Sequence, residues 1–180
     1  MKRIFTVLLL LCCLCLAGCG KVQTDNGKLK ITATVFPLYD WTANILDGLM
    51  GNDGSAELKM LVSGGKDIHS YQPSAADIIT ISSSDVFIYV GGESDAWVAD
   101  ALKNAVNKDM IIVNLLDVLG DLAKEEAAPE GWDEGNGEHG SSGHDEDEEY
   151  DEHIWLSLKN AAVCCRAIAD ALKAADGKNA

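Results

Sequence analysis

Hydrophobic and polar positions change their period several times along the chain, and each period predicts an element of secondary structure. Apolar runs rich in β-branched residues, some alternating with polar positions, predict four strands at residues 29–35, 57–62, 85–90 and 110–115. The third run reads DVFIYV and is apolar almost throughout. We therefore expect this strand to be buried on both faces of a sheet.

Apolar residues three or four positions apart predict helices between and after these strands. The first helix opens at Pro37 and ends before Gly51, and its apolar positions are Leu38, Trp41, Ile45 and Leu49. A second is capped by Ser74 and ends near Ser83, and a third covers about residues 97–105. The last begins near Ser157, with a predicted inner face of Leu158, Ala161, Cys165, Ile168 and Leu172 and an outer face of Lys159, Arg166 and Asp170.

Strands that alternate with helices at this rhythm predict an α/β fold with a βαβ-type parallel sheet flanked by helices. Ligands of such sheets bind beyond the carboxyl ends of the strands, in the loops that lead into helices. The loop between the second strand and the Ser74 helix is of this kind, and it contains His69.

Residues 1–19 have the features of a targeting segment. Lys2 and Arg3 precede an apolar stretch of thirteen residues, 4–16, which is short for a membrane span of about 20 residues. The stretch ends in LAGC, which resembles the lipobox of bacterial lipoproteins and implies that Cys19 is diacylated and anchors the chain. The alternatives are an ordinary secretion signal with Cys19 incidental, or an uncleaved anchor. Residues 20–28 are then a tether, and residues 29–180 form the folded lobe.

The chain is acidic, with 29 Asp and Glu against 14 Lys and Arg and a formal net charge of −15. This charge disfavours nucleic acid as a partner, because phosphate binding needs a basic surface. Fourteen of the acids lie between Asp121 and Glu152, so we expect a solvated, flexible loop at residues 121–152. The loop contains His139 and His144, which are either incidental or weak metal-capturing groups.

The cysteines predict no disulfide framework. Cys12, Cys13 and Cys15 are lost with the signal peptide, and Cys19 carries lipid. The remaining pair, Cys164 and Cys165, are neighbours on a predicted helix and point about 100° apart, so we interpret them as small buried hydrophobic side chains.

Two histidines occupy matching positions. His69 lies five residues before the cap Ser74, and His153 lies four residues before the cap Ser157. Each alone is most simply a hydrogen-bonded loop residue, but as a pair at the same end of the sheet they are equally consistent with metal ligands. The flanking acids could supply oxygen ligands or orient the imidazoles; they are Asp67, Asp151 and Glu152.

An enzyme is the least favoured class. A zinc hydrolase needs three protein ligands, an open water position and a nearby carboxylate base. The sequence contains no HExxH motif, and its histidines are too few for such a centre.

Four segments carry a resemblance to the zinc/manganese solute-binding lipoproteins of bacterial ABC importers. They are the lipobox at Cys19, ITATVFPLYDWTANI, DIHSYQPSAADI followed by DVFIYVGGESDAWV, and DEHIWLSLKNA after an acidic, His-bearing insertion. The resemblance covers nearly the whole chain from about Lys30. It implies two α/β lobes joined by a long helix, with the metal between them and with His69 and His153 as ligands.

The acidic insertion resembles that of zinc-specific members, so the resemblance implies Zn²⁺ as cargo, with Mn²⁺ as the alternative. It also implies a lipid anchor on the extracytoplasmic face of the cell membrane and delivery of the metal to an ABC importer permease. Some members of the family are described as adhesins, so a lipid-anchored adhesion or interaction module remains an alternative.

The sequence departs from the family in three places. Ile68 stands where many members have Pro or Glu before the first histidine, and Glu152 stands where many have Pro before the second. The chain also ends at Ala180, in or just after the expected linking helix, so it resembles an N-terminal half without the second lobe's ligands. Two histidines and water would make an open, weaker site, and a fragment without a transport role is the remaining alternative.

Overall fold

Four parallel strands form the centre of the computed structural model, which describes residues 27–51, 54–103, 105–124 and 152–176. Their order across the sheet is β2-β1-β3-β4. The elements in chain order are β1 (Leu29–Ala33), α2 (Phe36–Ile45), β2 (Ala56–Met60), α3 (Ala75–Ser82), β3 (Val86–Tyr89), α4 (Val98–Lys103), β4 (Ile111–Asn114), α5 (Leu115–Leu119), α6 (Asp121–Lys124), the short 3₁₀ helix η1 (Ile154–Leu156) and α7 (Leu158–Ala175). The predicted parallel α/β fold is confirmed.

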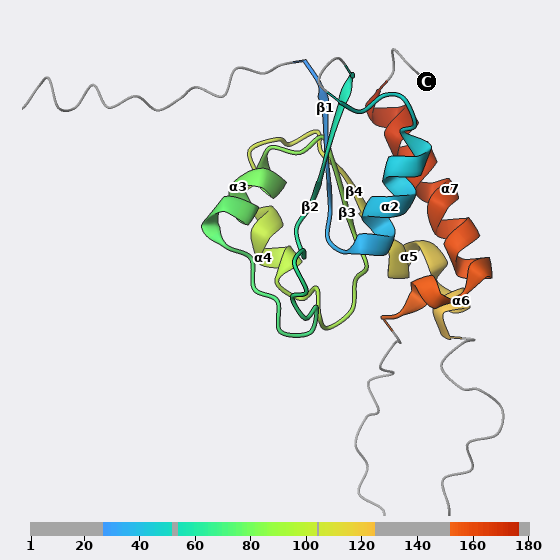
Figure 1. Cartoon of the computed structure of the whole chain (residues 1–180). Helices are drawn as coiled ribbons and strands as arrows, with labels where there is room; N and C mark the ends of the chain where they lie inside the picture. The colour runs from blue at the N-terminus through green and yellow to red at the C-terminus, as the bar shows by residue number, and fades with distance from the viewer. Residues whose placement is uncertain (1–26, 52–53, 104, 125–151, 177–180) are drawn as a thin grey trace, which may run out of the picture.

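Helices cover both faces of the sheet (Figure 1). Helices α2, α5 and α7 lie on one face, and α3 and α4 lie on the other. Strand β3 contributes to both layers, because Val86 and Ile88 pack with the first group while Phe87 packs with the second. All three side chains are fully buried, so the prediction that this strand is buried on both faces is confirmed.

Helix α2 is shorter than predicted. It ends at Ile45, and Leu49 lies in the turn that follows, at the surface. Gly48 adopts a positive φ of 77°, which a right-handed helix cannot include. The helical spacing of apolar residues continues to Leu49, beyond the end of the helix, and this is why the predicted helix was too long.

The predicted inner face of the last helix is wrong in its first two turns. Leu158 is 89% exposed, and Cys165 is only half-buried. The buried residues of α7 are Asn160, Cys164, Ile168 and Leu172. These four follow a strict four-residue spacing, so the helix is rotated relative to the stripe drawn through Leu158, although Ser157 caps it as expected.

Two short helices follow β4 where no helix was predicted. The Asn114 side chain accepts hydrogen bonds from the backbone N–H groups of Leu116 and Asp117 and so caps α5, and Gly120 ends it. Helix α6 occupies the first residues of the segment expected to be a flexible loop. Asn114 followed three residues later by Asp117 is a helix-capping signal. It was missed because the surrounding residues are apolar and were assigned to the strand.

The predicted signal peptide, the tether up to residue 26 and residues 125–151 of the acidic segment lie outside the described residues. Within the described ranges, no helix combines the length and the apolar character needed to cross a bilayer.

Candidate metal site

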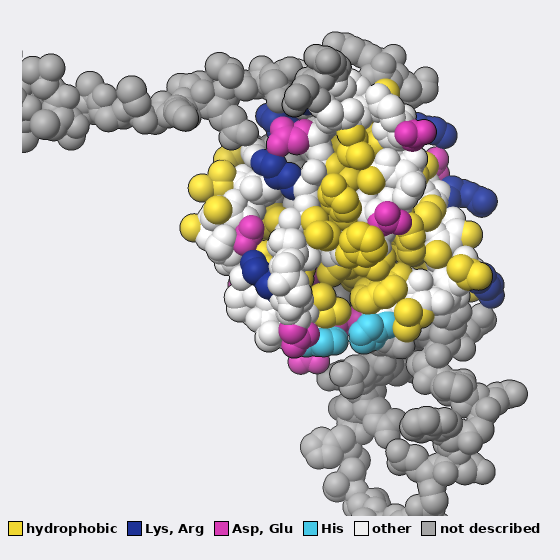
Figure 2. Space-filling model, in the orientation of Figure 1, with side chains coloured by type: hydrophobic (Ala, Val, Ile, Leu, Met, Phe, Trp, Pro, Cys, Tyr) yellow, Lys and Arg dark blue, Asp and Glu magenta, His cyan; other side chains and the backbone are white. Residues whose placement is uncertain are grey.

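Three loops that lie far apart in the sequence meet beyond the carboxyl ends of the strands. His69 lies between β2 and α3, Ser94 lies between β3 and α4, and Glu152 and His153 immediately precede η1. Figure 2 shows the two described histidines at the same end of the molecule, beside acidic side chains. This is the edge at which parallel sheets bind ligands.

The imidazole rings of His69 and His153 lie side by side. Their centroids are 5.7 Å apart and their planes are inclined by 53°. Both residues are exposed. On its other side His153 contacts Trp155 edge-on, with centroids 5.3 Å apart. The two histidines that were predicted to lie at the same end of the sheet are therefore next to each other.

Tyr71 lies two residues after His69 in the sequence, but it does not line the site. It is buried and packs edge-on against Trp97, with centroids 5.6 Å apart. This contact belongs to the core layer on the α3 and α4 side of the sheet.

The Nδ1 atom of His69 faces the protein. It lies 2.9 Å from the Ser94 hydroxyl, with which it shares a hydrogen bond, and 3.9 Å from Oε2 of Glu152. The other ring nitrogen, Nε2, is the atom through which this ring can bind a metal while that hydrogen bond is kept.

Glu152 is held inside the site by the loop that contains Ser94. Its Oε1 accepts a 2.7 Å hydrogen bond from the Ser94 backbone N–H. Its side chain is only 11% exposed, and its buried Oε2 has no hydrogen-bond partner among the described residues. The carboxylate sits against Gly92, where a Cβ atom would collide with it. A buried carboxylate beside two imidazoles suits a cation.

Asp95 fixes the loop between β3 and α4. Its Oδ2 accepts hydrogen bonds from the backbone N–H groups of Val90 and Gly91, at 3.0 and 3.1 Å. Burial raises the pKa of the Asp95 carboxyl, the two N–H groups oppose that shift, and the charge of Glu152 adds to it. Asp95 therefore serves the loop rather than the site.

Asp67 also shapes a loop. Its Oδ1 accepts a hydrogen bond from the backbone N–H of His69 at 3.1 Å, and its Oδ2 lies 3.5 Å from the Ser70 hydroxyl. The loop then enters α3 through the predicted capping box, in which Ser74 and Asp77 exchange hydrogen bonds. These bonds hold both ends of the short loop segment that contains His69.

The described residues supply two imidazoles to the site and no closed ligand cage. No group of three or more His, Cys, Asp or Glu side chains in the described ranges is arranged to hold a metal ion. The remaining candidates, Cys19, His139, His144 and Asp151, lie outside these ranges. Sequence reasoning missed Ser94 and Gly92, because a Gly-Gly pair after a strand indicates only that the strand ends.

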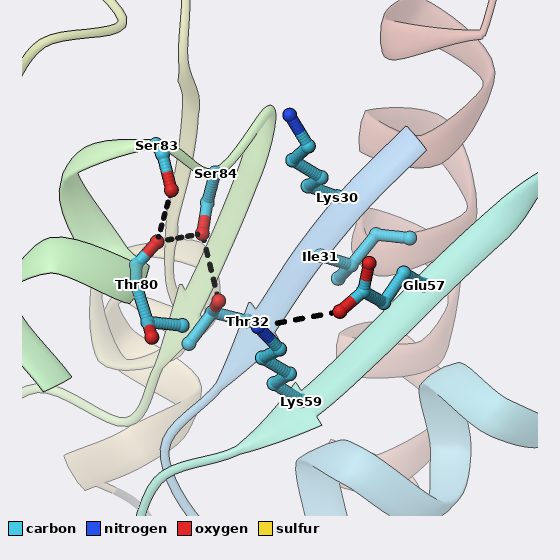
Figure 3. Close-up of a pocket in the computed structure, with 8 residues that line it drawn as sticks. All are labelled: Lys30, Ile31, Thr32, Glu57, Lys59, Thr80, Ser83 and Ser84. Atoms are coloured by element: carbon cyan, nitrogen blue, oxygen red, sulfur yellow. Dashed lines mark hydrogen bonds and ion pairs between the residues drawn. The ribbon is translucent and has the colours of Figure 1, made fainter. Parts of the chain in front are cut away.

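A small hollow lined by residues of β1, β2 and the end of α3 does not belong to this site (Figure 3). It lies near the amino ends of β1 and β2 and contains neither histidine. Its polar groups bond to one another: the hydroxyls of Thr32 and Ser84 are 2.7 Å apart, and Ser84 donates to the Thr80 carbonyl.

Comparison with known proteins agrees with this fold. Residues 31–180 match the family described as ZnuA, zinc-uptake complex component A, periplasmic. The chain is 31% identical over 174 residues to the zinc-binding lipoprotein AdcA of Streptococcus pneumoniae serotype 4, which covers 97% of this chain and 32% of AdcA.

Solved structures give the same result. The Zn(II)-bound ZnuA-like domain of Streptococcus pneumoniae AdcA matches with a TM-score of 0.58 and 25% identity, over 85% of this chain and 46% of that one. The Mn-bound periplasmic metal binding protein of Candidatus Liberibacter asiaticus matches with a TM-score of 0.58 and 27% identity, over 83% and 46%.

The parallel α/β lobe matches one lobe of metal-binding periplasmic proteins whose structures are solved. The chain belongs to the ZnuA family of zinc-uptake proteins, and the resemblance inferred from its sequence motifs is confirmed. It spans about a third of the length of AdcA and just under half of the solved domains that it matches.

Proposed function

We propose that this chain is a lipid-anchored, extracytoplasmic solute-binding protein that captures Zn²⁺ and delivers it to an ABC metal importer. The observation that carries the proposal is the juxtaposition of the His69 and His153 rings, 5.7 Å apart at the ligand-binding edge of the sheet. The family match and the zinc-bound relatives support it.

In this proposal His69 and His153 are the zinc ligands of this lobe, and Cys19 carries the lipid anchor. Imidazole suits zinc, whereas manganese favours more oxygen ligands. Zinc usually takes four ligands, so water or other protein groups complete the coordination. His139 and His144 at most collect ions and raise their local concentration. The cargo is bound and released, so the site needs neither a nucleophile nor a general base.

Calorimetric titration tests the proposal. The chain from residue 20 onward, which contains every described residue, is titrated with Zn²⁺ and separately with Mn²⁺ at neutral pH. We expect a one-to-one zinc event that is tighter than the manganese event and weakens on acidification, because imidazole binds a metal only when deprotonated. Tighter binding of Mn²⁺ would identify manganese rather than zinc as the cargo. The absence of any binding would favour the adhesion or interaction module.

A further inference from the structure

Glu152 contacts His69 but has no role in a site made of the two histidines alone. Glu152 is a mostly buried acid beside the histidines, and one of its oxygens accepts a hydrogen bond while the other has no hydrogen-bond partner in the described part of the chain. A buried carboxylate oxygen without a partner is costly unless a positive charge or a proton donor offsets it.

Glu152 is not arranged as a direct ligand. Its free oxygen Oε2 lies nearest to Nδ1 of His69, at 3.9 Å, and that nitrogen already bonds to Ser94. It also forms no metal-ligating group of three with the two described histidines. The carboxylate therefore faces the side of the ring that points away from an ion bound at Nε2.

The charge of this oxygen bears on which ring nitrogen carries the proton. A neutral imidazole has one N–H and one lone pair, and its partners decide which nitrogen holds which. With the proton on Nδ1, the N–H donates to the Ser94 hydroxyl and its positive end faces Oε2. With the proton on Nε2, the Nδ1 lone pair faces the carboxylate, which is electrostatically unfavourable.

We propose that Glu152, held by the Ser94 N–H and accommodated by Gly92, is a positioning residue that keeps His69 in the Nδ1–H tautomer and so presents its Nε2 lone pair to the metal. The inference rests on the proposed function for its consequence, zinc capture, but the tautomer exists without metal. Outer carboxylates of this kind commonly change metal affinity by about 10–100-fold.

Glu152→Gln tests the proposal sharply. The amide oxygen must take the place of Oε1 to accept the Ser94 N–H, so the NH₂ group is turned toward Nδ1 of His69. A donor there favours a lone pair on Nδ1 and a proton on Nε2. The substitution therefore reverses the preference while keeping the size of the side chain. Glu93→Gln, one residue before Ser94 and exposed, is the control for loss of one negative charge.

The measurement is long-range ¹H–¹⁵N correlation of the histidine rings in the metal-free chain from residue 20 onward, followed by zinc titration of each variant. We expect Nδ1–H at His69 in the wild type and in Glu93→Gln. We expect a shift toward Nε2–H in Glu152→Gln, with about 10–100-fold weaker zinc binding and an unchanged unfolding temperature.

Two results would overturn the inference. One is a wild-type His69 protonated on Nε2, whether or not zinc binds. The other is an unchanged tautomer in Glu152→Gln; if zinc binding is nevertheless lost, Glu152 is a ligand rather than a positioning residue. A wild-type chain that shows Nδ1–H but binds no zinc would instead contradict the proposed function and leave the tautomer assignment standing.

Discussion

The carboxylate of Glu152 occupies the space into which a side chain on Gly92 would project. The two residues come from different loops, and the Ser94 N–H bond to Glu152 holds them together. The missing side chain of Gly92 thus lets the segment before η1 approach the loop after β3, and it brings His153 with it.

Gly92→Ala is therefore expected to disrupt the site beyond its cost to the backbone. Gly48 has nearly the same φ, 77° against 78°, but a Cβ there meets nothing within 4 Å. Both alanine variants should lose about 1–2 kcal/mol of unfolding free energy through backbone strain. Only Gly92→Ala should also weaken zinc binding, by about tenfold or more. Urea unfolding and zinc titration of the two variants measure the difference, and equal zinc affinities would refute the link between Gly92 and the site.

The capping box at the start of α3 makes a separate contribution to stability. The Ser74 hydroxyl accepts the Asp77 N–H, and the Asp77 carboxylate accepts the Ser74 N–H. Ser74→Ala should lower the free energy of unfolding by about 1 kcal/mol, because the first turn loses its side-chain acceptor. Urea denaturation measures this value. Ser83→Ala, at the other end of the same helix, is the control and should change little.

The same carboxylate makes stability depend on acid. Burial tends to raise the pKa of Asp77, but the hydrogen bonds from Ser74, together with smaller effects of Tyr71 and of the Lys66 charge, outweigh it, so the pKa lies below the ordinary value of 3.8. The unfolded chain then binds a proton more readily than the folded one. The stabilisation is present above about pH 4 and is lost as the pH falls through the lowered pKa. In Asp77→Asn this part of the decrease should be absent when urea midpoints are compared between pH 5 and pH 3; an identical decrease in both proteins would contradict the assignment.

The adjacent cysteines should differ in reactivity. Cys164 is fully buried, and burial, with a smaller effect of the Cys165 thiol, raises its pKa to about 11. Cys165 is half-buried, and burial raises its pKa as well. In the native chain from residue 20 onward, a disulfide reagent should modify Cys165 first and reach Cys164 only after denaturant is added. A Cys165→Ala variant should show no early reaction, and equal rates for the two thiols would show that α7 is rotated differently.

Burial of the Cys164 thiol also predicts a loss of stability in alkali. The unfolded thiol, with an ordinary pKa of 9.0, releases its proton before the folded one does. Below about pH 9 the thiol is protonated in both states and does not change the free energy of unfolding. This free energy falls as the pH rises from about 9 toward 11, because only the unfolded chain loses the proton. Cys164→Ala should show a shallower decrease over this interval in thermal unfolding, and an unchanged slope would argue against the buried environment.

Local signals in the sequence were sufficient for the architecture. The β-branched run 85–90 and the cap Ser74 depend on neighbours in the chain, and both were predicted correctly. The orientation of α7 was not, because its buried stripe includes the polar Asn160 and leaves Leu158 exposed. That choice is made by the elements packed against the helix, which no local pattern contains.

The candidate site was predictable only in part, for a similar reason. His69 and His153 could be paired because each precedes a capped helix in a fold that brings such loops to one edge. Ser94, Gly92 and the inward orientation of Glu152 depend on contacts between loops that are distant in the sequence. Only the folded chain reveals which acid beside the histidines turns inward, and Asp67 instead caps its own loop.

The central claim is that the His69 and His153 rings together form the zinc-binding part of this lobe. Its most direct test is zinc calorimetry on the chain from residue 20 onward, beside His69→Ala, His153→Ala and a deletion of residues 133–149, which removes His139 and His144. The account predicts that each single substitution abolishes the main binding event and that the deletion leaves it intact. Loss of binding in the deletion alone, with both substitutions unaffected, would contradict it.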